Sequence, residues 1–226
     1  MQKYNKGFTL TEVILTIAII GVIVSMTIPV LTTKIQKNQA YTGVMKALSS
    51  LSQAAISLRT NNSETFSGIA YSDSDLANAF SDKFKVVTFC NDSSDSANCY
   101  DVANVKNLNG GNYEGVTNFL SNHPKFLTND DFVYTFIITD ATSNCGSSSY
   151  VRNSIDEGCG EVYVDVNGKK SPNTVGKDIF VYSVNKFNLT PFEVAGDDYC
   201  NTSSGFSTNG KECATKAVSE GKIGYY

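Results

Sequence analysis

The sequence has little of what most enzymes and nucleic-acid-binding proteins use. Its 226 residues include a single histidine, His123, which excludes a metal site built from several histidines. It lacks both the G-x-S-x-G motif of serine hydrolases and the GxxxxGK[ST] phosphate-binding loop. Basic residues are not in excess, since 18 lysines and arginines stand against 22 aspartates and glutamates, for a net charge of −4. We therefore expect neither an enzyme nor a protein that binds nucleic acid through its charge.

The longest apolar run lies close to the N-terminus. Residues 8–31 read FTLTEVILTIAIIGVIVSMTIPVL and contain one charged residue, Glu12. A helix of about 20 apolar residues is long enough to cross a bilayer. Lys3 and Lys6 precede the run, and basic flanks stay on the cytoplasmic side of the membrane. The sequence therefore predicts one membrane-spanning helix whose N-terminus is cytoplasmic and whose C-terminal continuation lies outside the inner membrane.

Three interpretations of this apolar segment compete: a secretory signal peptide, a plain single-pass anchor, and a membrane helix with a further role. A signal peptide has an apolar stretch of about 7–15 residues followed by an A-x-A-like site, and this run is longer and has no convincing site after it. A carboxylate inside the membrane costs about 2.5–3.5 kcal/mol even on lenient scales. Glu12 therefore favours the third interpretation, the alternative being that its side chain only reaches the headgroups.

The hexapeptide GFTLTE at residues 7–12, followed by an unbroken apolar run, resembles the N-terminus of type IV pilins and type II secretion pseudopilins. The resemblance implies that a prepilin peptidase cleaves between Gly7 and Phe8 and that the new N-terminal residue, Phe8, is N-methylated. It also matches Glu12 to the glutamate that acts in assembly, and Pro29 to a proline that kinks the helix. Thr11 departs from the pattern, because many members of the family have isoleucine or valine there.

The same resemblance implies partners and a location. The Glu12 carboxylate would neutralise the α-amine of Phe8, in a neighbouring subunit or in the same one, and so hold subunits together in a poorly solvated medium. Partners would be other pilin or pseudopilin subunits, the prepilin peptidase and an inner-membrane assembly platform. The subunit would start in the bacterial inner membrane and end in a periplasmic or extracellular filament. The alternative is a singly anchored extracytoplasmic binding protein that does not polymerise.

A second helical pattern follows the apolar run. Between residues 35 and 58, apolar side chains recur at spacings of three and four, which predicts an amphipathic helix that packs on a sheet of the same chain. These residues are Ala40, Val44, Ala47, Leu48, Leu51, Ala55 and Leu58. Pro29 lacks an amide hydrogen and should kink or locally melt the helix near Ser25. The polar stretch 59–63 is the expected end of the helix.

The rest of the chain predicts a small antiparallel sheet. Runs rich in β-branched and aromatic residues predict strands at 83–90, 132–139, 162–166 and 179–184, with short helices at 73–80 and 113–120. Residues 196–226 read mostly as loop. The fold class is thus α+β and, with the resemblance, pilin-like. The expected parts are a leader (1–7), a transmembrane and assembly helix (8–31), its amphipathic continuation (32–62) and a disulfide-containing α+β head (63–226).

Six cysteines, an even number without a CxxC motif, predict disulfides in an exported chain. Six cysteines allow 15 pairings, and the sequence alone does not choose among them. We favour pairing between neighbours, because each neighbouring pair brackets one polar loop; zinc-binding spacings are absent. The expected pairs are Cys90–Cys99, Cys145–Cys159 and Cys200–Cys213.

A second resemblance lies in residues 161–180, EVYVDVNGKKSPNTVGKDIF, which are similar to a D-x-N-G…P-N…G-x-D-x-F block in the globular half of many pseudopilins. It implies a Ca²⁺ site with oxygen ligands from Asp165, Asn167 and Asp178. The residues themselves predict a strand, an Asn-Gly turn, a Pro-Asn bend and a second strand. Because only two carboxylates are present and the EF-hand spacing is absent, we favour a hairpin without a cofactor, with calcium as the alternative.

Overall fold

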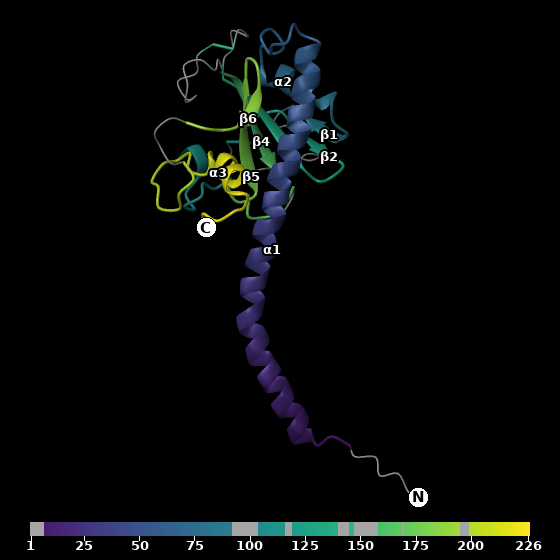
Figure 1. The fold of residues 1–226 in the computed structure, drawn as a ribbon, viewed down its shortest axis with the longest axis vertical. Helices are drawn as coiled ribbons and strands as arrows, with labels where there is room; N and C mark the ends of the chain where they lie inside the picture. The colour runs from purple at the N-terminus through teal and green to yellow at the C-terminus, as the bar shows by residue number, and fades with distance from the viewer. Residues whose placement is uncertain are drawn as a thin grey trace, which may run out of the picture. The chain divides into compact units, whose positions relative to one another are not determined.

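The computed structural model describes residues 7–91, 104–115, 119–139, 145–146, 158–168, 170–194 and 199–226. By its internal contacts the chain forms two compact units, residues 1–39 and 40–226, and the first helix, α1 (Leu10–Thr60), contributes to both (Figure 1). The long N-terminal helix packed on an antiparallel sheet gives the α+β, pilin-like class expected from the sequence.

The first unit is the N-terminal part of α1. Among the described residues, α1 is the one helix long and apolar enough to cross a membrane. Its large apolar side chains from Leu10 to Leu31 are between 41% and 77% exposed. The helix is continuous at Pro29, where the hydroxyls of Thr32 and Thr33 donate to the proline carbonyl at 3.0 and 2.9 Å. The helix therefore does not melt at Pro29, and a kink there stays a prediction.

The second unit is built around one six-stranded antiparallel sheet whose order follows the chain. Its strands are β1 (Val86–Cys90), β2 (Lys125–Thr128), β3 (Val133–Ile138), β4 (Gly158–Asp165), β5 (Ile179–Asn185) and β6 (Leu189–Pro191). Strands β3, β4 and β5 form the centre, with Val162 opposite Phe136 on one side and Tyr182 on the other. β1 and β6 are the edges, which explains why Pro191 is tolerated in β6.

The C-terminal half of α1 covers one face of this sheet (Figure 1). The predicted stripe is buried there: Val44, Ala47 and Leu51 are fully inaccessible and pack with aromatic side chains from the strands. The Tyr182 hydroxyl donates to the Val44 carbonyl at 2.9 Å. Gly43 lies so close to Val166 that a Cβ atom would be 2.7 Å from the valine Cβ. The helix is thus fixed to the sheet by apolar packing, a buried hydrogen bond and a close backbone approach.

Helix α2 (Asp73–Ser81) is tied to the sheet by its first residue. The Asp73 carboxylate accepts a hydrogen bond from the Ile138 amide at 2.6 Å and lies 2.7 Å from Nδ1 of His123. Ser72 caps the helix by accepting a hydrogen bond from the Asp75 amide at 3.2 Å. His123, which lies outside the helices and strands, therefore has a defined partner in Asp73.

Successive side chains along the strands point to opposite faces of the sheet, which gives the second unit two apolar clusters. Phe180 and Tyr182 of β5 face α1, whereas Ile179 and Val181 face a second cluster on the opposite side. That second cluster also contains Tyr163 of β4. A short C-terminal helix, α3 (Cys213–Glu220), buries its apolar side in the first cluster.

The structure corrects several element predictions. The α1 end at Thr60, α2 and the strands β1, β3, β4 and β5 match the expected segments within a few residues. The helix expected at 113–120 is wrong where it is described: only a 3₁₀ turn, η2 (Tyr113–Gly115), forms, because Glu114 and Gly115 both have positive φ. The sequence also misses β2, β6 and α3, which are short elements stabilised by tertiary contacts.

Candidate functional site

The N-terminus of α1 is organised by two side chains. Thr9 precedes the first helical residue, and its amide and hydroxyl both donate to Oε2 of Glu12 at 2.9 Å. In return, the Glu12 amide donates to the Thr9 hydroxyl at 3.3 Å. This reciprocal arrangement is a capping box, in which residues three apart satisfy amides that the helix leaves without partners.

The capping box gives Glu12 a role that the sequence analysis did not assign. The T-x-x-E spacing before an apolar run is itself a known helix-start pattern, so Thr9 could have been found from the sequence. The carboxylate also lies in the first turn of α1, where a negative charge favours the helix dipole. Helix capping therefore accounts for a glutamate at position 12 without a second subunit. A role of Glu12 in assembly needs an experiment that distinguishes it from capping.

The expected cleavage site lies just outside the helix. Gly7 and Phe8 precede its first turn, and Phe8 is 89% exposed. Apart from Gly7 and its two chain neighbours, no atom lies within 4 Å of a Cβ built on Gly7. A peptide bond in such a segment is accessible without unwinding α1. Cleavage there would create an α-amine at Phe8, next to the capping box formed by Thr9 and Glu12.

A known sequence family matches this same segment. Residues 2–28 match the prokaryotic N-terminal methylation motif, the prepilin-type motif of type IV pilins and pseudopilins. No curated protein and no solved structure matches the chain. The motif supports a type IV pilin-like or pseudopilin subunit, and motif and fold together point to a structural protein. An apolar N-terminal helix with this motif fits a membrane-anchored protein that forms filaments.

The structure brings the three candidate calcium ligands together, but as partners of amides. Oδ1 of Asp165 accepts hydrogen bonds from the amides of Asn167 and Gly168, both at 3.0 Å. Asn167 directs its side-chain NH₂ group, at 3.0 Å, to Oδ2 of Asp178. In this orientation Oδ1 of the Asn167 side chain is buried and has no hydrogen-bond partner among the described residues.

Asp178 is the most constrained of the three. Besides the contact with Asn167, its Oδ2 accepts a hydrogen bond from the Asn173 amide at 2.7 Å, and its Oδ1 accepts one from the Thr174 amide at 2.6 Å. Burial raises the pKa of this carboxyl, although the hydrogen bonds act in the opposite direction. Among the described residues, no group of three or more His, Cys, Asp or Glu side chains could hold a metal ion. Calcium binding at this site stays a prediction, and the hydrogen bonds accepted by Asp165 and Asp178 stabilise the turns between β4 and β5.

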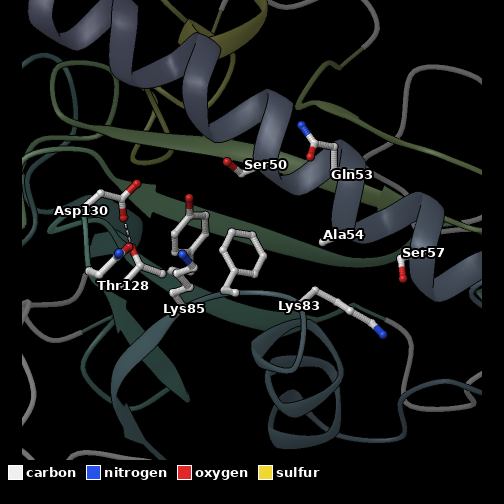
Figure 2. A pocket seen from close by; sticks show the side chains of 11 residues that line it. Ser50, Gln53, Ala54, Ser57, Lys83, Lys85, Thr128 and Asp130 are labelled. Atoms are coloured by element: carbon white, nitrogen blue, oxygen red, sulfur yellow. Dashed lines mark hydrogen bonds between the residues drawn. The ribbon is translucent and has the colours of Figure 1, made fainter.

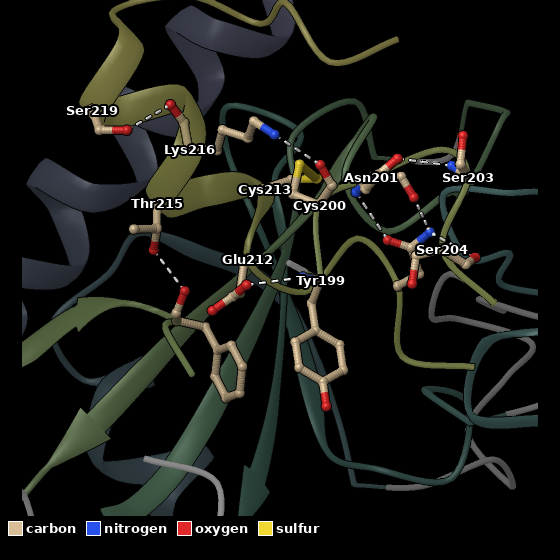
Figure 3. Close-up of a disulfide and its surroundings, with 12 residues drawn as sticks. Tyr199, Cys200, Asn201, Ser203, Ser204, Glu212, Cys213, Thr215, Lys216 and Ser219 are labelled. Carbon is tan, nitrogen blue, oxygen red and sulfur yellow. Dashed lines mark hydrogen bonds between the residues drawn. A yellow bond between two sulfur atoms is a disulfide. The ribbon is translucent and has the colours of Figure 1, made fainter. Parts of the chain in front are cut away.

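Two of the three expected disulfides lie in the described part of the chain. Cys145 is joined to Cys159 and Cys200 to Cys213, as the pairing of neighbours predicts. Cys99 lies outside the described residues, so the Cys90–Cys99 pair stays a prediction. Figure 3 shows the Cys200–Cys213 bond, with Glu212 beside it accepting a hydrogen bond from the Tyr199 amide at 2.9 Å.

A groove of about 350 Å³ lies beside the C-terminal half of α1. Figure 2 shows Ser50, Gln53 and Ser57 of the helix on one wall and Lys83 and Lys85, just before β1, on the other. At its end, Asp130 accepts a hydrogen bond from Thr128 and pairs with Lys46 at 2.7 Å. The groove is open and polar, and its one carboxylate is already paired.

Proposed function

We propose that this chain is a structural subunit, pilin or pseudopilin, of a type IV pilus-like or type II secretion filament. The observation that carries the proposal is the match of residues 2–28 to the prepilin-type motif, on a helix whose apolar side chains are exposed throughout the first unit. Exposing this much apolar surface to water is unfavourable, so α1 needs lipid before assembly and neighbouring helices after it.

The first step is processing by a prepilin peptidase. Cleavage between Gly7 and Phe8 and methylation of Phe8 would leave Thr9 and Glu12 in place and start the mature chain beside the helix cap. Intact-mass and N-terminal peptide measurements on membrane-extracted protein test this step. A mature N-terminus near residues 26–32 would contradict it and indicate a conventional signal peptide.

The second step is assembly through Glu12. The Phe8 α-amine carries a positive charge at the positive end of the helix dipole, where it is unfavourable unless a carboxylate is close. The Glu12 carboxylate of a neighbouring subunit can supply that charge. Other subunits and an inner-membrane assembly platform would be the partners, and the filament would extend into the periplasm or beyond the cell.

Helix capping and charge pairing can be separated by two variants. Glu12→Gln keeps an oxygen that can accept the hydrogen bonds from Thr9, because glutamine also serves in capping boxes, but it removes the charge. Thr9→Ala removes the hydroxyl of the cap and keeps the charge. If charge pairing drives assembly, Glu12→Gln abolishes filaments and Thr9→Ala weakens them less; if capping is the main role, the order reverses.

The readout is the mass of sheared or secreted filament relative to total cellular subunit. Glu12→Leu, which removes both the cap and the charge, is the reference for complete loss. Membrane fractionation and the N-terminal mass verify that each variant is inserted and cleaved. If Glu12→Leu polymerises like the parent, charge pairing through Glu12 is not the assembly mechanism. If the parent itself forms no filaments, the alternative of a singly anchored extracytoplasmic binding protein is favoured.

A further inference from the structure

A second cavity lies on the face of the sheet opposite the C-terminal half of α1. Its volume is about 250 Å³, and it opens between β4, the segment after β6 and the loop that precedes α3. Three aromatic rings and three charged groups line it. They are Phe119, Phe192 and Tyr199, with Glu114, Glu161 and Lys211.

One cation already occupies part of this cavity. Nζ of Lys211 lies 2.8 Å from both carboxylate oxygens of Glu161 and 4.3 Å from the centre of the Phe192 ring. Both charged side chains are only 9% exposed. The Tyr163 hydroxyl donates to the same carboxylate at 2.9 Å. The cavity thus accommodates an ammonium group between a carboxylate and an aromatic face, the arrangement that favours desolvated cations.

Glu114 is the second carboxylate in the cavity, and its backbone is strained. Its φ of 53° and ψ of 15° lie in the left-handed region, which glutamate rarely adopts and glycine adopts at no cost. Its amide is fixed by a 3.1 Å hydrogen bond to the Ser207 carbonyl. Among the described residues its carboxylate has no hydrogen-bond or ion-pair partner, and burial raises its pKa although the charge of Lys211 acts in the opposite direction. Strained residues with unused polar groups are concentrated at functional sites.

We propose that this cavity binds an organic cation, an ammonium or guanidinium group at the end of a flexible stem, with Glu114 as its counter-ion. Two carboxylates and one amine give the cavity walls a net charge of −1, so a ligand with a single positive charge would neutralise them. The rings of Phe119 and Tyr199 supply faces for the cation and its stem, as Phe192 does for Lys211. The volume of about 250 Å³ suits one side chain or a small amine, since drug-sized ligands need roughly 300–1,000 Å³.

The binding test uses full-length protein in detergent micelles and isothermal titration calorimetry. The cationic probes are N-acetyl-lysine N-methylamide, N-acetyl-arginine N-methylamide and n-butylammonium. The neutral probes are N-acetyl-norleucine N-methylamide and a methyl glucoside. We expect the cationic probes to bind at about millimolar concentration or below and the neutral probes not to bind. Butylammonium binding would show that a free amine suffices, whereas binding of the amino-acid derivatives alone would indicate a side chain of a peptide.

Variants at Glu114 separate recognition from folding. Glu114→Gln should weaken cation binding at least tenfold with an unchanged melting temperature. Glu114→Gly should raise the melting temperature, because it removes the left-handed strain, while it also abolishes binding. Glu64→Gly is the matched control: Glu64 is exposed, has a φ of 63° and lies outside the cavity, so its replacement should stabilise the protein and leave binding unchanged.

Several results would overturn the proposal. Equal binding of the norleucine derivative would assign the site to apolar ligands, and binding of the glucoside alone would assign it to sugars. Absence of binding by every cationic probe, or full binding by Glu114→Gln, would remove Glu114 as a counter-ion. None of these outcomes depends on processing or filament assembly.

Discussion

The attachment of α1 to the sheet can be tested at one glycine. A Cβ atom at Gly43 would lie 2.7 Å from Cβ of Val166, 2.9 Å from its Cγ2 and 3.1 Å from its Cγ1, closer than side-chain atoms tolerate. Val166 cannot retreat easily, because its amide donates at 2.9 Å to the Asp178 carbonyl. Gly43→Ala should therefore push the helix away from the sheet.

Two opposing terms set the size of the effect. Alanine is better than glycine inside a helix by about 0.5–1 kcal/mol. Overpacking a core costs about 1–3 kcal/mol. The sum predicts that Gly43→Ala lowers the free energy of unfolding by roughly 0–2.5 kcal/mol, where helix propensity alone would raise it. Urea unfolding of the full-length protein in detergent, followed by tyrosine fluorescence, measures the difference.

A double-mutant cycle gives the decisive comparison. Val166→Ala removes the Cγ contacts at 2.9 and 3.1 Å and keeps the Cβ contact at 2.7 Å. Gly43→Ala should therefore cost less in that background without becoming free of cost, with a coupling energy of about 0.5 kcal/mol or more. Ser49→Ala, at an exposed position on the same helix, controls for propensity. If Gly43→Ala stabilises the protein as much as the propensity difference allows, the close contact with Val166 does not exist and the reasoning fails.

Three further predictions concern stability of the second unit. Replacing Cys200 and Cys213 with serine should cost about 3 kcal/mol in the chain-entropy account for a loop of this length, measured by denaturant unfolding with and without reductant. Tyr182→Phe should cost about 0.5–1.5 kcal/mol, since only the hydrogen bond to α1 is lost; an unchanged melting curve would contradict this. Burial raises the pKa of Asp73, but its two hydrogen-bond partners outweigh it and hold the pKa below the ordinary value. Its contribution is therefore complete above the unfolded pKa of about 3.9 and is lost as the pH falls through the lower folded pKa. Asp73→Asn should destabilise the protein by about 1–2 kcal/mol at neutral pH and by progressively less in acid, as a pH series of melting temperatures will show.

Most of the fold could be predicted because its largest elements carry local signals. The apolar stripe that contains Val44 and Leu51 repeats with the helical period. Strands β3 and β5 are rich in β-branched and aromatic residues, which are typical of strands and uncommon in turns. The missed elements lack such signals. Strand β2 begins with Lys125, whose buried ammonium group donates to the Ser121 and His123 carbonyls, a contact that only the folded chain supplies.

The candidate sites divide in the same way. The cleavage motif and Glu12 are contiguous in sequence, so a linear pattern finds them, and the T-x-x-E cap could have been found as well. The cation site was not predictable, because Glu114, Glu161 and Lys211 are far apart in sequence and meet only through the sheet and the C-terminal loop. The proximity of the calcium candidates was predictable, but the orientation of the Asn167 side chain, whose NH₂ group donates to Asp178, was not.

Under the proposed function, the capping box would let one carboxylate serve both the isolated subunit and the filament. A bare carboxylate in lipid costs about 2.5–3.5 kcal/mol, and hydrogen bonds from the Thr9 amide and hydroxyl would reduce that cost for a subunit in the membrane before assembly. Both bonds go to Oε2. Among the described residues Oε1 accepts none, and a carboxylate has about four lone-pair sites. An incoming α-amine can therefore bind Oε1 without breaking the cap, so assembly would add an ion pair and lose no hydrogen bond. Thr9 would then lower the free-energy cost of keeping Glu12 in the membrane, and the charge of Glu12 would supply the free energy gained on assembly.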